Sequence, residues 1–549
     1  MKFLRTAAPR FLTILLALLI ELAALSALGH YLPGVVALAE GIARLLSIII
    51  VVTLINNSRH LSSDIMWILL IILVPAFGTL LYLFLGTSLI TSKTTLSLVK
   101  SQYEAKKYLR QDPQVLQAAE DRNKELKGQL HYISASEGYP VYRNRQFDYY
   151  PSGEEGYPHM LEEMRRAEHF IFLEYFIIEE GKMWDGMLEI LQEKAQQGLD
   201  VRVMYDDMGS LQTLPSSYAK KLESMGIRCV RFNKINPVLS SIMNHRDHRK
   251  IMVIDGKTAF SGGVNLADEY INEKEKFGYW KDTVIRIKGE AVWSYIVLFL
   301  TNWNALRPTD SDWNVFKDGF KVKETEESAE PVKTGNANTS DVFPARASLD
   351  SLYESSDRSE DDLSDASSDG FIAPYGETPL DDQHTGQDIY MNILNSSNHY
   401  CYIFTPYLII DTELENALIL AARRGVDIRI ITPGIPDKKM IWRITRSFYK
   451  NLINGGVKIY EYTPGFDHAK VFVSDDRLAA VGTINLDYRS LYLHFENGTL
   501  LYDSKEIPAI RDDLLAAVKV SRLMEVKDVK VNVFTSMFIG IAKLFASEM

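Results

Sequence analysis

The sequence predicts an α/β protein in which two similar halves form one pseudo-twofold catalytic unit, preceded by N-terminal transmembrane helices. Three observations predict this class. A polar motif occurs twice in the chain, with its two copies 220 residues apart. Around each copy, short apolar strands alternate with helical segments of about ten to fifteen residues, a pattern typical of α/β sheets. Long apolar stretches, one of them uncharged, open the chain.

The repeated motif is a histidine followed at fixed spacing by a lysine, an aspartate, a glycine and an asparagine. Its residues are His248, Lys250, Asp255, Gly262 and Asn265 in the first copy, and His468, Lys470, Asp475, Gly482 and Asn485 in the second. Five such matches arise by chance on the order of once per million positions. The motif therefore indicates an internal duplication.

The segments around the two motifs follow the same order. In the first half, the predicted strands are 169–176, 201–205 and 228–232, and the predicted helices are 160–167, 183–197 and 218–225. In the second half, AARRGVDIRIITP echoes AQQGLDVRVMYDD, and NGGVKIYEY echoes MGIRCVRF. We expect a mostly parallel or mixed sheet in each half. Cys229 and Cys401 lie in apolar runs and are expected to be buried thiols.

The net charge of −11 is concentrated in one segment. Residues 324–369 hold thirteen Asp or Glu residues against three basic ones, so the rest of the chain is nearly neutral and its charge says little about partners. This segment has too few apolar residues to offset the entropy of folding, which predicts a disordered surface insertion.

Three apolar stretches, 11–28, 35–55 and 65–85, predict two or three membrane-embedded helices. The third has 21 uncharged residues, enough to cross a bilayer. The second contains Glu40 and Arg44, which can pair at i, i+4. The first stretch could instead be a signal peptide. Basic residues flank both ends of the region, and such residues favour the cytoplasmic side of a membrane. This predicts an even number of crossings, with the catalytic halves in the cytoplasm. Three crossings, with the two ends on opposite sides, is the alternative.

These patterns divide the chain into six parts. The predicted parts are a membrane region 1–91, a helical connector 92–127, a first half 128–323, the acidic Ser-rich insertion 324–369, a second half 370–525 and an apolar C-terminal helix 526–549. For the last, packing against the protein and lying in a membrane interface are both open.

The motif residues suit chemistry at a phosphate diester. A histidine and a lysine two residues apart on a strand share a face, and a carboxamide adds hydrogen-bond donors. Asp255 enters an Asp-Gly turn, so within the catalytic motif it and Asp475 are expected to act mainly as structural support. Two copies facing one phosphorus permit double displacement, in which one neutral imidazole attacks and the other, protonated, serves the leaving oxygen.

We expect neither a metal nor a cofactor, since the two motifs lack HExxH, CxxC or a carboxylate cluster. Asp282 and Glu496 each follow a motif and begin a predicted strand. Either carboxylate could orient a histidine by binding its second ring nitrogen. A surface or salt-bridged carboxylate is the alternative for both.

At these residues the chain resembles the phospholipase D superfamily, and within it the bacterial cardiolipin synthases. The resemblance rests on NHRDHRKIMVIDGKTAFSGGVNLADEY, YWKDTVIRIKGEAVW, FTPYLIIDTELENALILAARRGVDIRIITP, DHAKVFVSDDRLAAVGTINLDYRS and WILLIILVPAFGTLLYLFLG. His494 departs from it, because an asparagine is expected before Phe495 and Glu496.

The resemblance implies two phospholipase D-type halves with His248 as nucleophile and His468 as general acid/base. It further implies that Lys250, Lys470, Asn265 and Asn485 hold the phosphate, together with Gly263 and Thr483, and that Asp282 and Glu496 support the histidines.

The implied reaction is phosphatidyl transfer between two phosphatidylglycerol molecules at a bacterial cell membrane, with glycerol released. A phospholipase D that uses water or another alcohol is the alternative. A nuclease is disfavoured because no basic, aromatic-interleaved stripe is present. A lipid-binding scaffold without activity is disfavoured by the two complete motifs.

Overall fold

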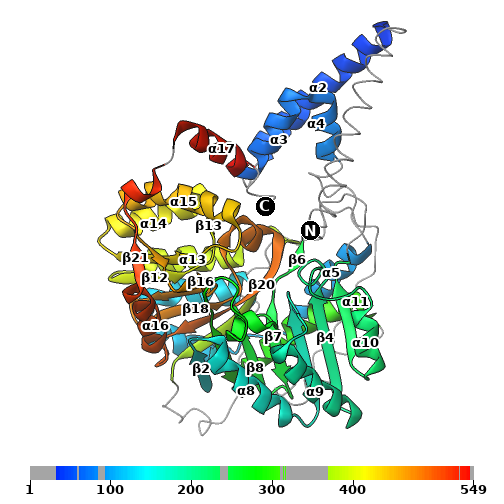
Figure 1. The fold of residues 1–549 in the computed structure, drawn as a ribbon, viewed down its shortest axis with the longest axis vertical. Coiled ribbons are helices and arrows are strands. Elements are labelled where there is room, and N and C mark those ends of the chain that lie inside the picture. The colour runs from blue at the N-terminus through cyan, green and yellow to red at the C-terminus, as the bar shows by residue number, and fades with distance from the viewer. Residues whose placement is uncertain are drawn as a thin grey trace.

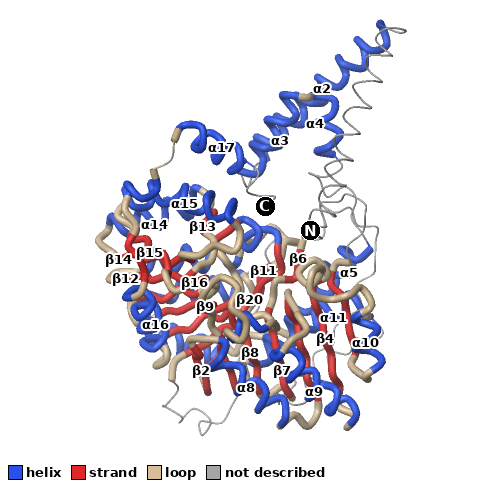
Figure 2. The backbone as a smooth tube through the Cα atoms, in the orientation of Figure 1, coloured by secondary structure: helices blue, strands red, loops and turns tan. Residues whose placement is uncertain are grey.

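The computed structural model describes residues 33–57, 61–83, 93–234, 245–308, 313, 316, 369–530 and 532–544 (Figure 1). The first predicted apolar stretch, 11–28, and the acidic insertion up to residue 368 lie outside these residues. Helices and strands alternate through both halves, as Figure 2 shows. This confirms the predicted α/β class.

The first half is built on a mixed sheet, which among the described residues has seven strands in the order β2-β10-β8-β7-β3-β4-β5. Strands β3, β4 and β5, at one end of this order, are parallel, and the remaining pairs are antiparallel. The strands are β2 (Gln146–Tyr150), β3 (Phe170–Tyr175), β4 (Asp200–Asp206), β5 (Arg228–Phe232), β7 (Lys250–Ile254), β8 (Thr258–Gly262) and β10 (Val284–Lys288).

The second half repeats this order as β11-β20-β18-β17-β12-β14-β15. Within the described residues the sheet is extended by β1 and β21 at its edges and by β6, which pairs with β20. The strands are β1 (Tyr142–Arg143), β6 (Arg246–Asp247), β11 (Phe371–Glu377), β12 (Tyr400–Phe404), β14 (Asp427–Pro433), β15 (Lys458–Tyr462), β17 (Val471–Ser474), β18 (Leu478–Gly482), β20 (His494–Tyr502) and β21 (Ser521–Leu523). The duplicated motif therefore marks a duplicated sheet.

Helices cover the outer face of each sheet, and a shared core lies between the sheets. The outer helices are α8 (Gly153–Arg165), α9 (Lys182–Gln196) and α10 (Tyr218–Ser224) on the first half, and α13 (Thr385–Ser396), α14 (Thr412–Arg423) and α15 (Lys439–Asn454) on the second. Both faces of strand β3 are buried, and its residues are apolar except for the buried Glu174. Leu173 faces the outer core, while Phe172 faces the central one.

The central core joins the two halves. Helices α11 (Val292–Leu306) and α16 (Ile507–Lys519) contribute to it, together with residues of both sheets. On α11, every residue from Val292 to Ala305 is buried, and Phe299 stacks on Phe172 at 4.7 Å. From the predicted connector, α5 (Lys93–Ala105) packs along α11, where the Ser101 hydroxyl donates to the Thr301 carbonyl. Connector helices α6 (Pro113–Arg122) and α7 (Lys127–His131) follow.

The prediction of one continuous spanning helix over 65–85 is wrong. The segment forms α3 (Leu61–Leu73) and α4 (Pro75–Leu81), separated at Val74. Proline lacks a backbone N–H and disfavours helical conformation in the preceding residue, which accounts for the break. The second stretch is continuous as α2 (Pro33–Asn57), with Glu40 and Arg44 paired at 3.7 Å. Among the described helices, none combines the length and apolarity needed to cross a membrane.

The C-terminal segment forms α17 (Val533–Leu544), which contacts both α15 and α3. Both cysteines are buried and free, as predicted.

Candidate active site

The two motif histidines lie at the junction between the halves. Each follows a short strand that pairs with the opposite half: β6 runs parallel to the start of β20, and β16 (Gly465–Asp467) runs parallel to β9 (Tyr279–Lys281). The His248 N–H donates to the Phe495 carbonyl at 2.9 Å, and the His468 N–H donates to the Lys281 carbonyl at 2.7 Å. The expectation that histidine and lysine share one strand is corrected, because β7 begins only at Lys250.

Each histidine is bound by a carboxylate of the opposite half. His248 Nδ1 lies 2.8 Å from both carboxylate oxygens of Glu496, and His468 Nδ1 lies 2.7 Å from Asp282 Oδ2. Such a partner fixes the tautomer and the ring orientation. With the proton on Nδ1, the lone pair of Nε2 is available for reaction. Neither half alone therefore contains a complete imidazole–carboxylate pair.

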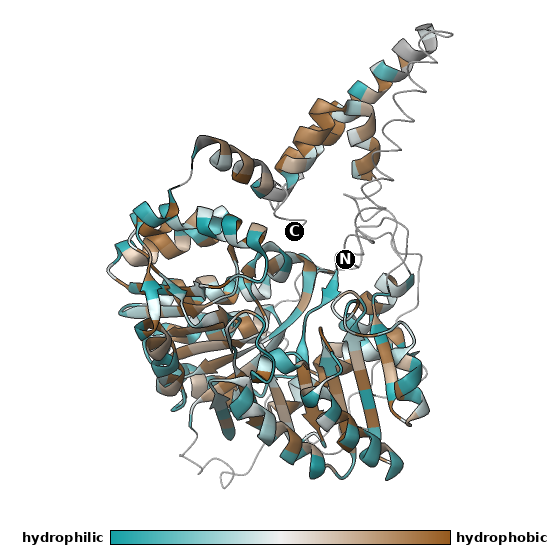
Figure 3. Cartoon of the chain, viewed as in Figure 1, coloured by the Kyte–Doolittle hydropathy of each residue, from teal (hydrophilic) through white to brown (hydrophobic). Residues whose placement is uncertain are grey.

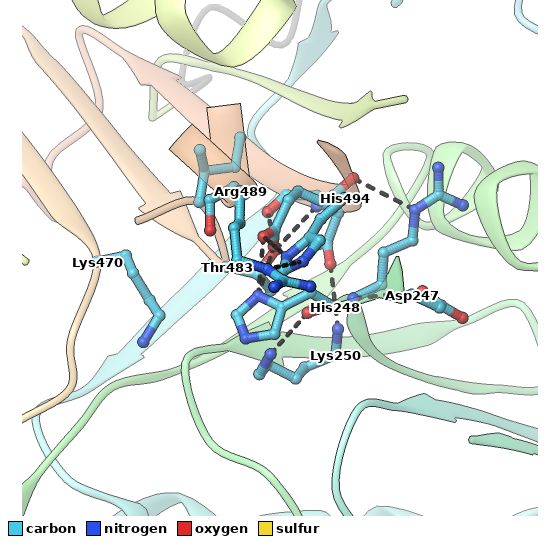
Figure 4. Close-up of polar contacts among 12 residues, drawn as sticks. Asp247, His248, Lys250, Lys470, Thr483, Arg489 and His494 are labelled. Carbon is cyan, nitrogen blue, oxygen red and sulfur yellow. Dashed lines mark hydrogen bonds and ion pairs between the residues drawn. The ribbon is translucent and has the colours of Figure 1, made fainter. Parts of the chain in front are cut away.

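The motif lysines are buried between these pairs. The Lys250 ammonium donates to the His248 carbonyl at 2.6 Å, and Lys470 donates to the His468 carbonyl. Figure 4 shows Lys470 of the second half reaching toward His248 and Lys250. Burial lowers the pKa of Lys250 to about 7 and that of Lys470 to about 8, while Glu496 and Asp282 act in the opposite direction.

Burial also keeps both histidines neutral. It lowers the pKa of His248 well below its usual range, and the charges of Lys250 and His494 add to this effect. It lowers the pKa of His468 to about 4, although Asp282 opposes the shift. Burial raises the pKa of Glu496 well above its usual range. The same burial thus disfavours the charged forms of both His248 and Glu496.

Two predicted phosphate ligands lie beside the carboxylates instead. A Cβ atom on Gly263 would lie 1.9 Å from Asp282 Oδ1, so glycine makes room for that carboxylate. The Thr483 hydroxyl at the matching position donates to Glu496. Both residues therefore position a carboxylate.

The motif asparagines differ in their contacts. Asn265 Oδ1 accepts from the Ile177 N–H at 3.0 Å, and its Nδ2 donates to the Tyr270 hydroxyl at 2.8 Å. Among the described residues, the buried Oδ1 of Asn485 has no hydrogen-bond partner. Of the two amides, that of Asn485 has the acceptor atom left over for a ligand's hydroxyl.

The motif aspartates lie far from the reacting groups. Asp255 follows β7, and its carboxylate accepts the backbone N–H groups of 168, 169 and 170 at 2.8 to 2.9 Å. Asp475 binds the N–H groups of 398, 399 and 400 in the same way. At about 3.3 Å per strand residue, Asp255 is roughly 16 Å from Lys250. These contacts agree with the structural support expected of both aspartates.

His494 and Trp280 are further neighbours of the motif histidines. In the sequence, His494 stood out only as a departure from the family pattern, and Trp280 was missed. Each stands two residues before an orienting carboxylate, and His494 shares a face of β20 with Glu496. Their rings lie 5.6 Å from His248 and 5.5 Å from His468, respectively. Arg489 donates to His494 Nε2 at 3.0 Å, which places the His494 proton on Nδ1, 3.5 Å from Glu496 Oε1. The alternation of strand side chains was the signal that could have found both residues.

In the part of the chain that the structure describes, one cluster has metal-ligating spacing, with atoms of His248, His494 and Glu496 within 4.8 Å of one another. Two imidazoles and one carboxylate are a donor set that transition metals accept, so the metal-free reaction stays a prediction.

Comparison with known proteins connects this geometry to a family. A family model described as "Cardiolipin synthase, PLD-like domain" matches residues 160–288 and 390–516, one match in each half. A model described as "Phospholipase_D-nuclease N-terminal" matches residues 45–86. A cardiolipin synthase of Alkalihalophilus pseudofirmus is 30% identical over 462 residues, 83% of each chain. The chain belongs to the cardiolipin synthase family. It is an enzyme of the phospholipase D superfamily.

Two further proteins are similar to this chain. An uncharacterized protein of Streptococcus mutans is 40% identical over 497 residues, which cover 90% of this chain and 98% of that protein. The phosphatidylserine synthase of Haemophilus influenzae has a TM-score of 0.53 at 15% identity, covering 78% of this chain and 99% of the other. The latter likeness concerns the fold alone. Each family match spans one histidine and the carboxylate that serves the other histidine.

Proposed function

We propose that this enzyme is a membrane-bound phosphatidyltransferase that makes cardiolipin and glycerol from two phosphatidylglycerol molecules through a phosphohistidine. The observation that carries the proposal is the crossed pair of imidazole–carboxylate contacts, each made by residues of both halves, with two buried lysines between them. A phosphodiester is the anionic centre that two imidazoles and two ammonium groups can serve together.

In the first step, His248 Nε2 attacks the phosphorus of one phosphatidylglycerol. The P–O bond to the glycerol headgroup breaks, and His468 donates its proton to the departing oxygen. This step requires a neutral His248 and a protonated His468. The phosphodiester anion favours protonation of a buried imidazole, and Asp282 favours it at His468 in particular.

In the second step, the headgroup hydroxyl of another phosphatidylglycerol attacks the phosphohistidine. His468 accepts the hydroxyl proton, the P–N bond breaks and neutral His248 is regenerated. Lys250 and Lys470 stabilise charge on the non-bridging oxygens in both steps. Their burial strengthens this electrostatic effect, because little water screens it.

Transfer of the phosphatidyl group to water or another alcohol is the second candidate. The same phosphohistidine would form, and only the acceptor in the second step would differ. The buried Asn485 Oδ1 could accept a hydrogen bond from any such hydroxyl. A nuclease or a scaffold without activity fits less well, because apolar residues are exposed along α2, including Leu38, Leu45, Ile48 and Val52, and both motifs are complete.

The test is product analysis by mass spectrometry after incubation of the full-length protein with phosphatidylglycerol. Cardiolipin and glycerol in equal amounts are expected. Phosphatidic acid as the main product would favour the hydrolase, and no turnover by folded protein would refute both enzymatic proposals. A substrate labelled in the glycerol headgroup separates transfer from hydrolysis in one reaction.

A further inference from the structure

Helix α15 carries a one-sided positive charge. It contains four basic residues and no acidic residue. Its buried face includes Ile444, Phe448 and Leu452. Lys439, Arg443 and Lys450 are exposed, and within the described residues none of these three forms an ion pair. Their spacing places them on one face of the helix, away from the core.

Helix α17 adds an apolar surface next to this charge. Phe534, Met537 and Phe538 are 81%, 61% and 52% exposed, and their i, i+3, i+4 spacing places them on one face. The last turn of the helix is anchored, because Ala542 is buried in the core of the second half and the Lys543 ammonium lies 3.8 Å from the centre of the Phe448 ring. Figure 3 shows hydrophobic residues on α17 and on the neighbouring α2–α4 unit, above the more hydrophilic α15.

The basic helix also lies close to the active site. It packs on β13 (Leu408–Ile409), which pairs with β19 (Leu486–Asp487), the strand that directly follows Asn485. Burial raises the pKa of Asp487, and the charge of Lys438, at the start of α15, opposes this shift. A lipid headgroup attracted to α15 would thus arrive beside the motif of the second half.

We propose that the exposed faces of α15 and α17 form a docking surface for a bilayer of anionic lipids. The basic side chains would bind lipid phosphates while the three apolar side chains of α17 enter the acyl region, the arrangement by which amphipathic segments bind anionic membranes. The inference deepens the proposed function, since an enzyme acting on an anionic lipid needs its site held at such a surface.

The first experiment measures lipid contact directly. Because Cys229 and Cys401 are buried, Phe538→Cys can be labelled selectively with an environment-sensitive fluorophore in the full-length protein. The protein is placed in phosphatidylcholine nanodiscs with or without phosphatidylserine, with a quencher on the acyl chains. Strong quenching is expected only with phosphatidylserine, and high salt should weaken it. The same label at Lys220→Cys, on α10, should stay unquenched.

The second experiment removes the charge. In the labelled protein, Lys439→Glu, Arg443→Glu and Lys450→Glu together should weaken docking by about 100-fold or more, since each basic residue near an anionic surface contributes about fivefold. A matched control reverses three other exposed, unpaired cations of the described chain, Lys124, Arg165 and Lys519, and should dock as before.

The outcomes separate this inference from the proposed function. Absence of quenching by the acyl-chain quencher would overturn the docking surface, and so would quenching that charge reversal leaves unchanged. Protection of position 538 from an aqueous quencher in the absence of lipid would also overturn it, because a protein partner would then cover this face. Quenching in phosphatidylserine discs without turnover of phosphatidylglycerol would overturn the proposed function alone. Charge reversal should also reduce turnover of bilayer phosphatidylglycerol at least tenfold while sparing a water-soluble short-chain form.

Discussion

At the scale of single residues, reactivity depends on the environment that the opposite half supplies. His248 and His468 have equivalent positions in the repeat, but their surroundings differ. His248 has Glu496, Thr483 and a second imidazole nearby, whereas His468 has Asp282 and the indole of Trp280. The additional positive charges near His248 favour its neutral form, which a nucleophile needs.

Removing either imidazole should stop the reaction. We expect His248→Ala and His468→Ala each to lower kcat at least about 1000-fold, because nucleophile and acid/base act as a unit. The exposed His399→Ala is the control and should keep full activity. Chelator should leave the wild-type rate unchanged, and a rate lost with chelator and restored by a metal ion would refute the metal-free mechanism.

The lysines should set the alkaline side of the pH profile. Their pKa values of about 7 and about 8 mean that the free enzyme loses phosphate-binding charge as pH rises through this range. kcat/KM should therefore fall above neutral pH, while kcat falls less because the bound anion keeps the lysines protonated. In Lys250→Arg the decline should move to higher pH. A kcat/KM that is constant from about pH 7 to about pH 9 would contradict this assignment.

His494 should act on the acid side of the same profile. In its protonated form His494 lowers the pKa of His248, so removing His494 raises that pKa. His494→Asn should shift the acid limb of kcat/KM to higher pH and lower the maximal rate by less than about tenfold. Trp280→Phe, at the matching position beside His468, should leave the acid limb in place. If the acid limb of kcat/KM stayed at the same pH in His494→Asn, His494 would have only a packing role.

The sequence identified most of these residues but not their pairing. Fixed spacing was sufficient to find His248, Lys250, His468 and Lys470. It did not show that Glu496 serves the first histidine and Asp282 the second, because that exchange depends on strands of two or three residues. Strands this short carry too little periodicity to be recognised in a sequence.

At the scale of elements, the motif aspartates stabilise strand ends. Asp255 has φ of 53° and accepts three backbone N–H groups, so Asp255→Ala both removes these acceptors and strains the backbone. We expect a loss of about 2 kcal/mol in the free energy of unfolding, with kcat within about threefold. The exposed neighbour Lys257→Ala should change stability by less than about 0.5 kcal/mol. A large loss of kcat at unchanged stability would return Asp255 to the catalytic set.

Predictions of elements succeeded where hydrophobic periodicity was strong. The strand predicted at 228–232 is β5 to the residue, and those at 169–176 and 201–205 agree within one residue at each end. The prediction of one helix over 65–85 was wrong because it rested on the length of the apolar stretch, and Pro75 within this stretch breaks the helix. A long stretch without charged residues indicates that the segment lies in apolar surroundings. Whether it forms one continuous helix depends on backbone hydrogen bonds that proline cannot make.

At the scale of the whole molecule, the halves should remain together without a covalent link. They share the central core and pair through β6 with β20 and β9 with β16. A specific protease site inserted between residues 324 and 369, then cut, should give two fragments that co-elute in gel filtration and retain at least about half of the activity, because buried apolar area of this kind holds domains together. The uncut variant is the control. Separation of the fragments with the activity retained would contradict the crossed site, since each imidazole would then have lost its carboxylate.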